Sequence, residues 1–183
     1  MAVPNVELSR VNLREMTQDD LDFVHSMLAN AEVMKHYPKC YSRDEAREWI
    51  ERNLQRYEDD GAGFWIVQDA EGTPVGQIGL LMQDVDELRE PEVAYMISQP
   101  YWRKGYANEV ATAIRDWAMD ERGHSHVISL IRPSNLPSQG VARSIGMKPW
   151  KTTRHRGLEH LVFRIRRTDR DALRAEQGGA TTV

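Results

Sequence analysis

The segment 101–109 (YWRKGYANE) places one glycine and two basic residues directly before an amphipathic pattern. In such a turn, successive backbone N–H groups and the start of a helix point toward one spot, which favours an anion such as phosphate. Gly105 and Ala107 are small enough to permit close approach, and Arg103 and Lys104 add positive charge. By composition alone, the same residues also fit a plain loop.

The sequence gives little support for a Rossmann or Walker phosphate-binding motif or for a nucleophilic cysteine. The glycine-containing stretch 61–63 precedes a strand pattern instead of following one, and no Gly-Lys-Ser/Thr sequence of the Walker type occurs. The single cysteine, Cys40, lies four residues after His36 without the strand–turn context of a catalytic pair, so we interpret it as structural. The six histidines show no metal-ligand spacing, and no metal is expected.

Length, charge and hydropathy limit the possible classes of protein. With 183 residues, mean hydropathy −0.61 and no apolar leader, the chain is predicted to be one cytoplasmic domain without a membrane segment. A net charge of −4 disfavours direct nucleic-acid binding. The charge is uneven, because residues 1–150 carry −8 and residues 151–183 carry +4.

The segment 101–109 sits among alternating strand and helix patterns. Thr17 is a predicted helix N-cap, and Ser42 with Glu45 forms a capping box. The pattern predicts a mixed α/β domain over residues 1–167 with a mostly antiparallel sheet, followed by a flexible polar tail over 168–183. Predicted strands are 6–15, 64–68, 75–82, 92–98, 126–131, 148–155 and 160–166, and predicted helices are 17–30, 42–57, 108–121 and 138–144.

Two motifs together resemble a known family. EVAYMI at 92–97 followed by PYWRKGYANE at 100–109 resembles the core motif of the GNAT superfamily of acyl-CoA-dependent N-acetyltransferases. The likeness is greatest to the RimJ/RimL-type branch, which includes acetylases of ribosomal-protein N-termini. NLPS at 135–138, with Gly146 eight residues after its serine, resembles that branch's second motif. The resemblance covers residues 8–165 and implies the GNAT fold, with helices flanking a central sheet.

In that fold, the resemblance implies a sheet splayed between the strand ending at Ile97 and the strand starting at His126, with acetyl-CoA entering the gap. Trp102 stands where the wider superfamily has Gln or Arg, so the phosphates are expected to meet backbone groups only. The implied cofactor-binding residues are Met96, Ile97, Arg103, Lys104, Gly105, Tyr106, Ala107, Asn108, Asn135 and Ser138, with the backbone near Met96 or Ile97 as the oxyanion donor.

The resemblance also suggests a general base. The amine must be neutral to attack, and about a tenth of free α-amines but only about 0.04% of lysine amines are neutral at pH 7. Glu92 would take the proton from its place beside the thioester. Alternatively it is one solvated carboxylate of an acidic loop that attracts a cationic amine; the other acidic residues of that loop are Asp84, Asp86, Glu87 and Glu90.

Ser138 is the second candidate catalytic residue. The position where many superfamily members have a tyrosine is occupied by Ala142, so the resemblance assigns the hydrogen bond to the leaving sulfur to Ser138. Its alternative role is to cap the short helix 138–144. His155 and His160 flank a predicted hairpin, where a surface role is favoured over lining the acceptor cleft.

These observations predict an N-acetyltransferase that moves acetyl from acetyl-CoA directly to a primary amine, such as a protein or peptide N-terminus. Alternatives are a small-molecule acetylase acting on a polyamine, amino acid or antibiotic, and a non-catalytic acyl-CoA-binding module. Either a monomer or a homodimer is compatible with the sequence.

Overall fold

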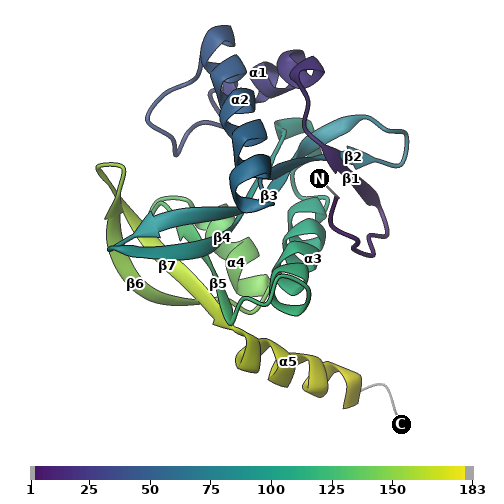
Figure 1. Cartoon of the computed structure of the whole chain (residues 1–183), viewed down its shortest axis with the longest axis vertical. Coiled ribbons are helices and arrows are strands. Elements are labelled where there is room, and N and C mark those ends of the chain that lie inside the picture. Colours follow the sequence, from purple (N-terminus) through teal and green to yellow (C-terminus); the bar gives the residue numbers. More distant parts are fainter. Residues whose placement is uncertain (1–2, 180–183) are drawn as a thin grey trace.

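Seven strands form one sheet in the computed structural model, which describes residues 3–179 (Figure 1). The strand order is β1-β2-β3-β4-β5-β7-β6, and all neighbours are antiparallel except β4 and β5. The strands are β1 (Val11–Glu15), β2 (Phe64–Asp69), β3 (Pro74–Val85), β4 (Leu88–Ile97), β5 (His126–Ile131), β6 (Lys148–His155) and β7 (Leu158–Arg166).

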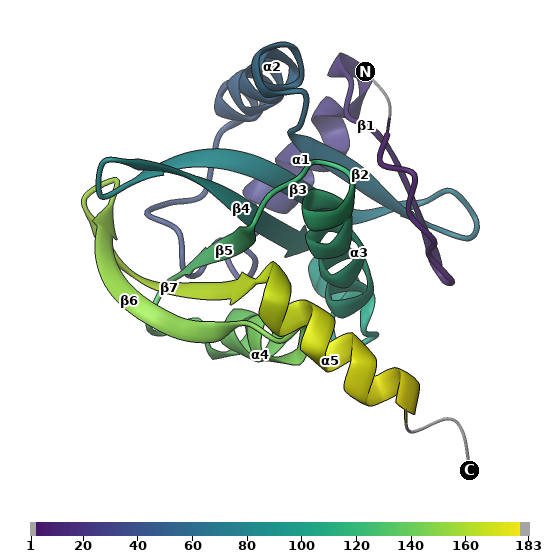
Figure 2. The same ribbon diagram turned by 60° about the horizontal axis from the view of Figure 1, so that its bottom comes forward.

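Helices cover both faces of the sheet (Figures 1 and 2). Helices α1 (Leu21–Leu28) and α2 (Arg43–Asp60) pack on one face through a cluster that includes Ile50, Ile66 and Met96. Helices α3 (Tyr106–Asp120) and α4 (Leu136–Ser144) pack on the other face. The predicted mixed α/β fold class is confirmed. Within the described residues, no helix has the length and apolar character needed to cross a membrane.

The sheet divides between β4 and β5, where the backbones pair only at Glu92 and Ile128. Beyond this point, the Ser129 hydroxyl donates to the carbonyl of Val93 over 2.7 Å. A side chain thereby replaces a ladder hydrogen bond where the strands separate, so the carbonyl remains satisfied although it is buried. The divergence agrees with the splay that the family resemblance implied.

Helix α2 stands over this division because its start and its packing are both locally encoded. The Ser42 amide donates to Glu45 Oε2 over 2.8 Å, and the Glu45 amide donates back to Ser42 Oγ over 3.3 Å, as the predicted capping box requires. Asn53, which no pattern singled out, is fully buried and makes two hydrogen bonds with the backbone of Phe64. Its amide therefore fixes α2 to the start of β2.

The acidic segment between residues 84 and 92 was predicted to be an exposed loop, and this prediction is wrong. It forms the ends of β3 and β4, joined by a tight turn in which Asp86 and Glu87 adopt positive φ angles of 48° and 69°. Glu90 and Glu92 are only 4% and 7% exposed, because both point from β4 toward the side covered by α1 and α2. Alternation along an extended strand, which the charge pattern concealed, buries these two carboxylates.

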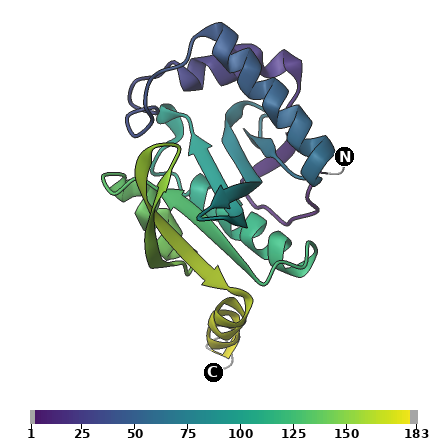
Figure 3. The same ribbon diagram turned by 60° about the vertical axis from the view of Figure 1, so that its left-hand side comes forward.

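The C-terminal residues also differ from the predicted flexible tail. Helix α5 (Arg167–Gly179) follows β7 directly and projects away from α1 and α2 (Figure 3), while residues 180–183 lie outside the described part. Arg170 is 2% exposed and bonds to Asp120 at 2.5 Å, to Asp171 at 2.7 Å and to Asp116 at 3.3 Å. Asp116 and Asp120 anchor the helix to α3, a pairing that no local pattern indicates.

We expect Arg170→Ala to lower the free energy of unfolding by roughly 2 kcal/mol at pH 7, because it removes the charge-assisted hydrogen bonds of a buried guanidinium to Asp116 and Asp120. The hydrogen bond from Arg170 holds the pKa of Asp120 below its usual range. This contribution is present above the unfolded-state pKa and is lost as the pH falls through the folded-state value. The difference from the parent protein should therefore shrink below about pH 4.

Urea unfolding at several pH values measures this effect. The matched control is Arg174→Ala, because Arg174 bonds to Asp116 and Asp120 but is 47% exposed. Its loss should cost less than about 1 kcal/mol. Equal costs for the two variants would contradict the anchoring role of Arg170.

Candidate active site

A cavity of about 280 Å³ lies where β4 and β5 separate. Helix α2, the segment between α1 and α2, the start of α4 and the β6–β7 turn complete its walls. The cavity brings Glu92 together with Asn135 and Ser138, which lie more than forty positions later in the sequence.

Glu92 is buried at the floor of this cavity. Its Oε2 accepts a hydrogen bond from Gln83 Nε2 at 2.7 Å, and its Oε1 accepts one from the Leu130 amide at 3.1 Å. Burial raises the pKa of Glu92, while these two hydrogen bonds and the charges of Arg156 and Arg56 oppose the rise. A carboxylate with a raised pKa is a better proton acceptor near neutral pH than an ordinary glutamate.

Ser138 and Asn135 occupy the α4 side of the cavity. Asn135, not Ser138, caps α4: its Oδ1 accepts from the Ser138 amide at 3.2 Å. This corrects the alternative role considered for Ser138. The Tyr95 hydroxyl donates to the Ser138 carbonyl at 2.8 Å and so joins β4 to the start of α4. Desolvation raises the pKa of Tyr95, so the group remains a protonated donor.

The segment between β4 and α3 has the conformation expected of an anion-binding turn. Arg103 and Gly105 adopt positive φ angles of 61° and 80°, and Gly105 occupies the N-cap of α3 without any side-chain capping bond. The first helical hydrogen bond runs from the Glu109 amide to the Gly105 carbonyl, so the preceding amides have no partner within the helix. Residues 103–105 and Asn108 are exposed, and Tyr106 and Ala107 are half-buried.

The N-terminal segment holds this turn from behind. Arg10 Nη1 donates to the Lys104 carbonyl at 2.6 Å, and Arg10 Nε donates to Glu109 Oε2 at 2.7 Å. The amides of Ser9 and Arg10 both donate to Glu109 Oε1, at 2.6 and 2.9 Å. A β-carbon at Gly105 would lie 3.1 Å from Arg10 Nη2, so the turn is closely packed as well as strained for other residues.

The ladder between β3 and β4 distinguishes Met96 from Ile97. The Ser98 amide donates to the Val75 carbonyl, and because paired residues alternate in an antiparallel ladder, Met96 also directs its amide toward β3. Ile97 then directs its backbone toward the gap, where its carbonyl accepts from Trp102 Nε1 at 2.6 Å. Of the two predicted oxyanion donors, the geometry therefore favours Ile97.

The remaining candidates are placed as follows. His155 and His160 flank the β6–β7 turn as predicted, and both also line the cavity, where their rings make an edge contact with centroids 5.9 Å apart. Cys40 is exposed, and His36 Nδ1 lies 3.1 Å from the Ser134 hydroxyl, with which it forms a hydrogen bond. Among the described residues, no group of three His, Cys, Asp or Glu side chains is arranged to hold a metal.

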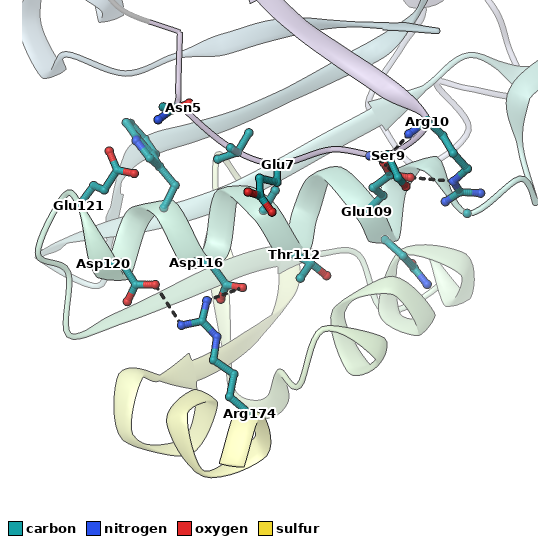
Figure 4. A pocket seen from close by; sticks show the side chains of 15 residues that line it. Asn5, Glu7, Ser9, Arg10, Glu109, Thr112, Asp116, Asp120, Glu121 and Arg174 are labelled. Atoms are coloured by element: carbon teal, nitrogen blue, oxygen red, sulfur yellow. Dashed lines mark hydrogen bonds and ion pairs between the residues drawn. The ribbon is translucent and has the colours of Figure 1, made fainter. Parts of the chain in front are cut away.

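A larger surface groove of about 780 Å³ runs along α3 between the N-terminal segment and α5 (Figure 4). It includes Gly105 and Asn108 but neither Glu92 nor Ser138. Its charged side chains are largely engaged with one another, since Arg10 bonds to Glu109 and Arg174 to carboxylates of α3 (Figure 4). We therefore place the candidate chemistry in the smaller cavity.

Several side chains of the cavity had no signal in the sequence. Gln83 holds Glu92, and Tyr95 holds Ser138. Arg56 on α2, Arg132 after β5 and Arg156 in the β6–β7 turn also line the cavity. Separated by tens of residues, these arginines looked like ordinary surface charges, and only the fold brings them to one place.

Comparison with known proteins identifies the family. Residues 10–148 match the family described as "Acetyltransferase (GNAT) domain". Uncharacterized protein YkkB of Bacillus subtilis (strain 168) is 33% identical over 147 residues, which cover 79% of this chain and 86% of YkkB.

Solved structures show the same fold. An acetyltransferase from Agrobacterium tumefaciens superposes with a TM-score of 0.78 at 23% identity, covering 91% of this chain and 96% of that one. The enzyme AAC(6')-Ib in complex with ribostamycin and coenzyme A gives a TM-score of 0.78 at 14% identity, covering 91% and 98%. Together with the family match, these comparisons show that the chain belongs to the GNAT family and is an acetyl-CoA-dependent N-acetyltransferase.

Proposed function

We propose that this enzyme acetylates a primary amine in the cavity at the β4–β5 division, with Glu92 as general base and no covalent acyl-enzyme. The observation that supports this most is the position of Glu92: a buried carboxylate with a raised pKa, held at the floor of the cavity that Ser138 also lines. Motif likeness suggests the RimJ/RimL-type branch, and hydropathy and cysteine usage suggest a cytoplasmic location; both stay predictions.

The turn before α3 fits the cofactor that the family uses. Acetyl-CoA supplies an activated acetyl thioester and a pyrophosphate. The uncapped start of α3 and the positive φ angles of Arg103 and Gly105 would direct backbone amides toward the phosphates. Arg103 and Lys104 add exposed positive charge. Asn135, which follows β5 on the other side of the gap, would contact the cofactor arm.

Each proposed chemical step uses one group of the chain. A Glu92 carboxylate oxygen takes the proton from the attacking amine, directly or through a water molecule. The Ile97 amide, directed into the gap, donates to the carbonyl oxygen as it gains charge. The Ser138 hydroxyl donates a hydrogen bond to the departing thiolate, while Tyr95 and Asn135 hold its backbone in place.

Two kinds of acceptor are compatible with the site: a protein or peptide N-terminus, and a small amine. The branch likeness favours a protein or peptide N-terminus, whose less basic amine needs only modest help from a base. The cavity itself, at about 280 Å³, lies at or below the lower end of the size range of ligand pockets and favours a small amine.

We expect Glu92→Gln to lower kcat by about 100-fold, because the amide cannot accept the proton. The parent enzyme should show an acid limb in kcat/KM at the pKa of Glu92, above the ordinary glutamate range. Below that pKa the base is protonated and the rate falls; in the variant this limb should be missing. Thiol release measured across pH on a panel of α-amines and ε-amines tests both effects.

Retention of the parent rate and of the acid limb would remove Glu92 as the base. If the parent protein acetylates nothing on a broad panel yet binds CoA, the proposed activity fails and a non-catalytic acyl-CoA-binding module is supported.

We expect Ser138→Ala to lower kcat by about tenfold, the loss of one hydrogen bond to a charged group, with KM little changed. Ser144→Ala is the matched control, because Ser144 lies on the same helix, its hydroxyl donates to the Val141 carbonyl and it does not line the cavity. Equal activity of the two variants would contradict a role for Ser138 in the chemical step.

We expect Gly105→Asp to weaken CoA binding by at least about 100-fold, because it strains the turn and places a negative charge beside the phosphates. Calorimetry measures the affinity. Gly123→Asp is the control: Gly123 has a similar φ of 77°, but a β-carbon there meets nothing within 4 Å. If both variants bind CoA like the parent protein, the assignment of the turn is wrong.

A further inference from the structure

The charges that line the cavity are predominantly positive. Four arginines and three histidines line it, whereas Glu92 is the only carboxylate among its described lining residues. The arginines are Arg52, Arg56, Arg132 and Arg156, and they carry the positive charge; the histidines, His36, His155 and His160, have lowered pKa values and are neutral at pH 7. This is the opposite of an acidic site suited to a cationic amine, which was one interpretation of the acidic segment around Glu92.

The acidic side chains near the cavity are already engaged elsewhere. Asp86 bonds to Lys151 at 2.7 Å and to the Thr153 hydroxyl at 2.6 Å. Glu90 bonds to His126 at 2.5 Å. Asp60, which lies near Arg56, is paired with Arg89. Asp84 is exposed and contacts His155 through its backbone. The paired carboxylates Asp60, Asp86 and Glu90 therefore add little free negative charge.

Three arginines of the cavity lack such partners. Among the described residues, Arg56, Arg132 and Arg156 make no ion pair within 4 Å, and Arg52 has only a 3.4 Å contact with Glu48 one helical turn away. Arg132 Nη1 is buried and has no hydrogen-bond partner in the described part of the chain. A buried donor without a partner is costly and indicates a missing acceptor.

The ionisation of neighbouring groups also reports a positive field. Burial, together with the charges of Arg156 and Arg52, lowers the pKa of Arg56. Burial also lowers the pKa of His36, His155 and His160, and nearby positive charge lowers it further. The charges are Lys35 and Arg132 for His36, Arg156 for His155 and Arg132 for His160. The positive charge of the four arginines that line the cavity therefore exceeds the negative charge of Glu92.

These cations are separate from the predicted phosphate turn. None of residues 98–108 lines the cavity. Arg52 and Arg56 come from α2 and Arg156 from the β6–β7 turn, on the walls away from Asn135 and Ser138. Glu92 lies between the two sides, within electrostatic reach of Arg56 and Arg156. An anion held by these arginines would thus place an attached amine near Glu92.

We propose that the acceptor is a small amine carrying its own anionic group, a carboxylate or a phosphate, which Arg56 and Arg156 bind with help from Arg52 and Arg132. This deepens the proposed acetyltransferase function and rests on it. Arginine guanidinium groups match both anions in geometry and charge. Aromatic side chains of the same cavity, Tyr41, Trp49 and Phe64, suit an apolar remainder. Polycationic acceptors such as polyamines are disfavoured.

Matched pairs of acceptors test the proposal. Phenylalanine is compared with phenylalaninamide, and O-phosphoethanolamine with ethanolamine, using thiol release from acetyl-CoA, with spermidine as the cationic arm. The amide's amine is less basic than that of the free amino acid, so intrinsic reactivity favours the amide. We expect kcat/KM to be at least about tenfold higher for one or both anionic members, and the two pairs distinguish carboxylate from phosphate.

Variants show whether the arginines cause the preference. Arg56→Gln and Arg156→Gln should each reduce it by about tenfold, mainly through KM, as expected for one charge-assisted interaction. Arg47→Gln is the matched control, because Arg47 lies on α2, is exposed, pairs with Asp44 and does not line the cavity. Thermal unfolding confirms that each variant is folded.

The outcomes separate the two proposals. Acetylation of amides or spermidine as efficient as that of the anionic amines, or a preference that survives in both variants, overturns the anionic acceptor and leaves the acetyltransferase function standing. If no amine is acetylated, the proposed function fails, and calorimetry on CoA-loaded protein with phenylalanine and O-phosphoethanolamine decides the anion site. Binding that Arg56→Gln weakens supports it; no binding of either probe overturns it.

Discussion

The separation of β4 from β5 after one backbone pair is the constraint on which the site depends. Parallel strands that part leave buried N–H and C=O groups without ladder partners, and each must be satisfied in another way. Here the Ser129 hydroxyl donates a hydrogen bond to the Val93 carbonyl, and a Glu92 carboxylate oxygen accepts one from the Leu130 amide. Glu92 is thus held by the same irregularity that opens the cavity. Its position is a consequence of the sheet and does not depend on a flexible loop.

The local distribution of charge, and not the net charge of the chain, indicates where anionic ligands bind. The chain is negative overall, yet two separate places gather positive charge: the turn before α3 and the cavity at the sheet division. The acidic residues at the β3–β4 turn do not neutralise the cavity, because Asp86 and Glu90 are bonded to Lys151 and His126. Two separate anion-attracting sites, one of which shares its cavity with Glu92, are compatible with binding two negatively charged reactants together.

Local sequence patterns were sufficient for most of the fold. The buried stripe of α3, from Val110 to Ala118, follows helical spacing, and the bounds of β5 and β6 match the predicted ranges, because apolar periodicity and turn residues act over a few positions. Helix α5 was missed because its stability comes from Arg170 meeting aspartates of α3, about fifty residues earlier in the chain.

The site was predictable only where a motif carried it. Glu92, Gly105, Asn135 and Ser138 lie in two contiguous motifs, and the fold places three of them in one cavity. The cavity arginines were not predictable, because a charged residue on the polar side of an amphipathic helix looks the same whether it faces solvent or another element. Arg56 is an example: its significance depends on a turn one hundred residues later in the chain.

The contacts of Glu109 make the start of the chain sensitive to events at the turn before α3. Ser9 and Arg10 donate to Glu109, and Arg10 also holds the Lys104 carbonyl. The docking of the N-terminal segment onto α3 is therefore energetically coupled to the conformation of the turn before α3. Thermodynamic linkage is reciprocal, so a ligand that requires this shape stabilises the docked segment by the same factor. Resistance of residues near Ser9 to proteolysis would then report occupancy of a site nearly one hundred residues away in sequence.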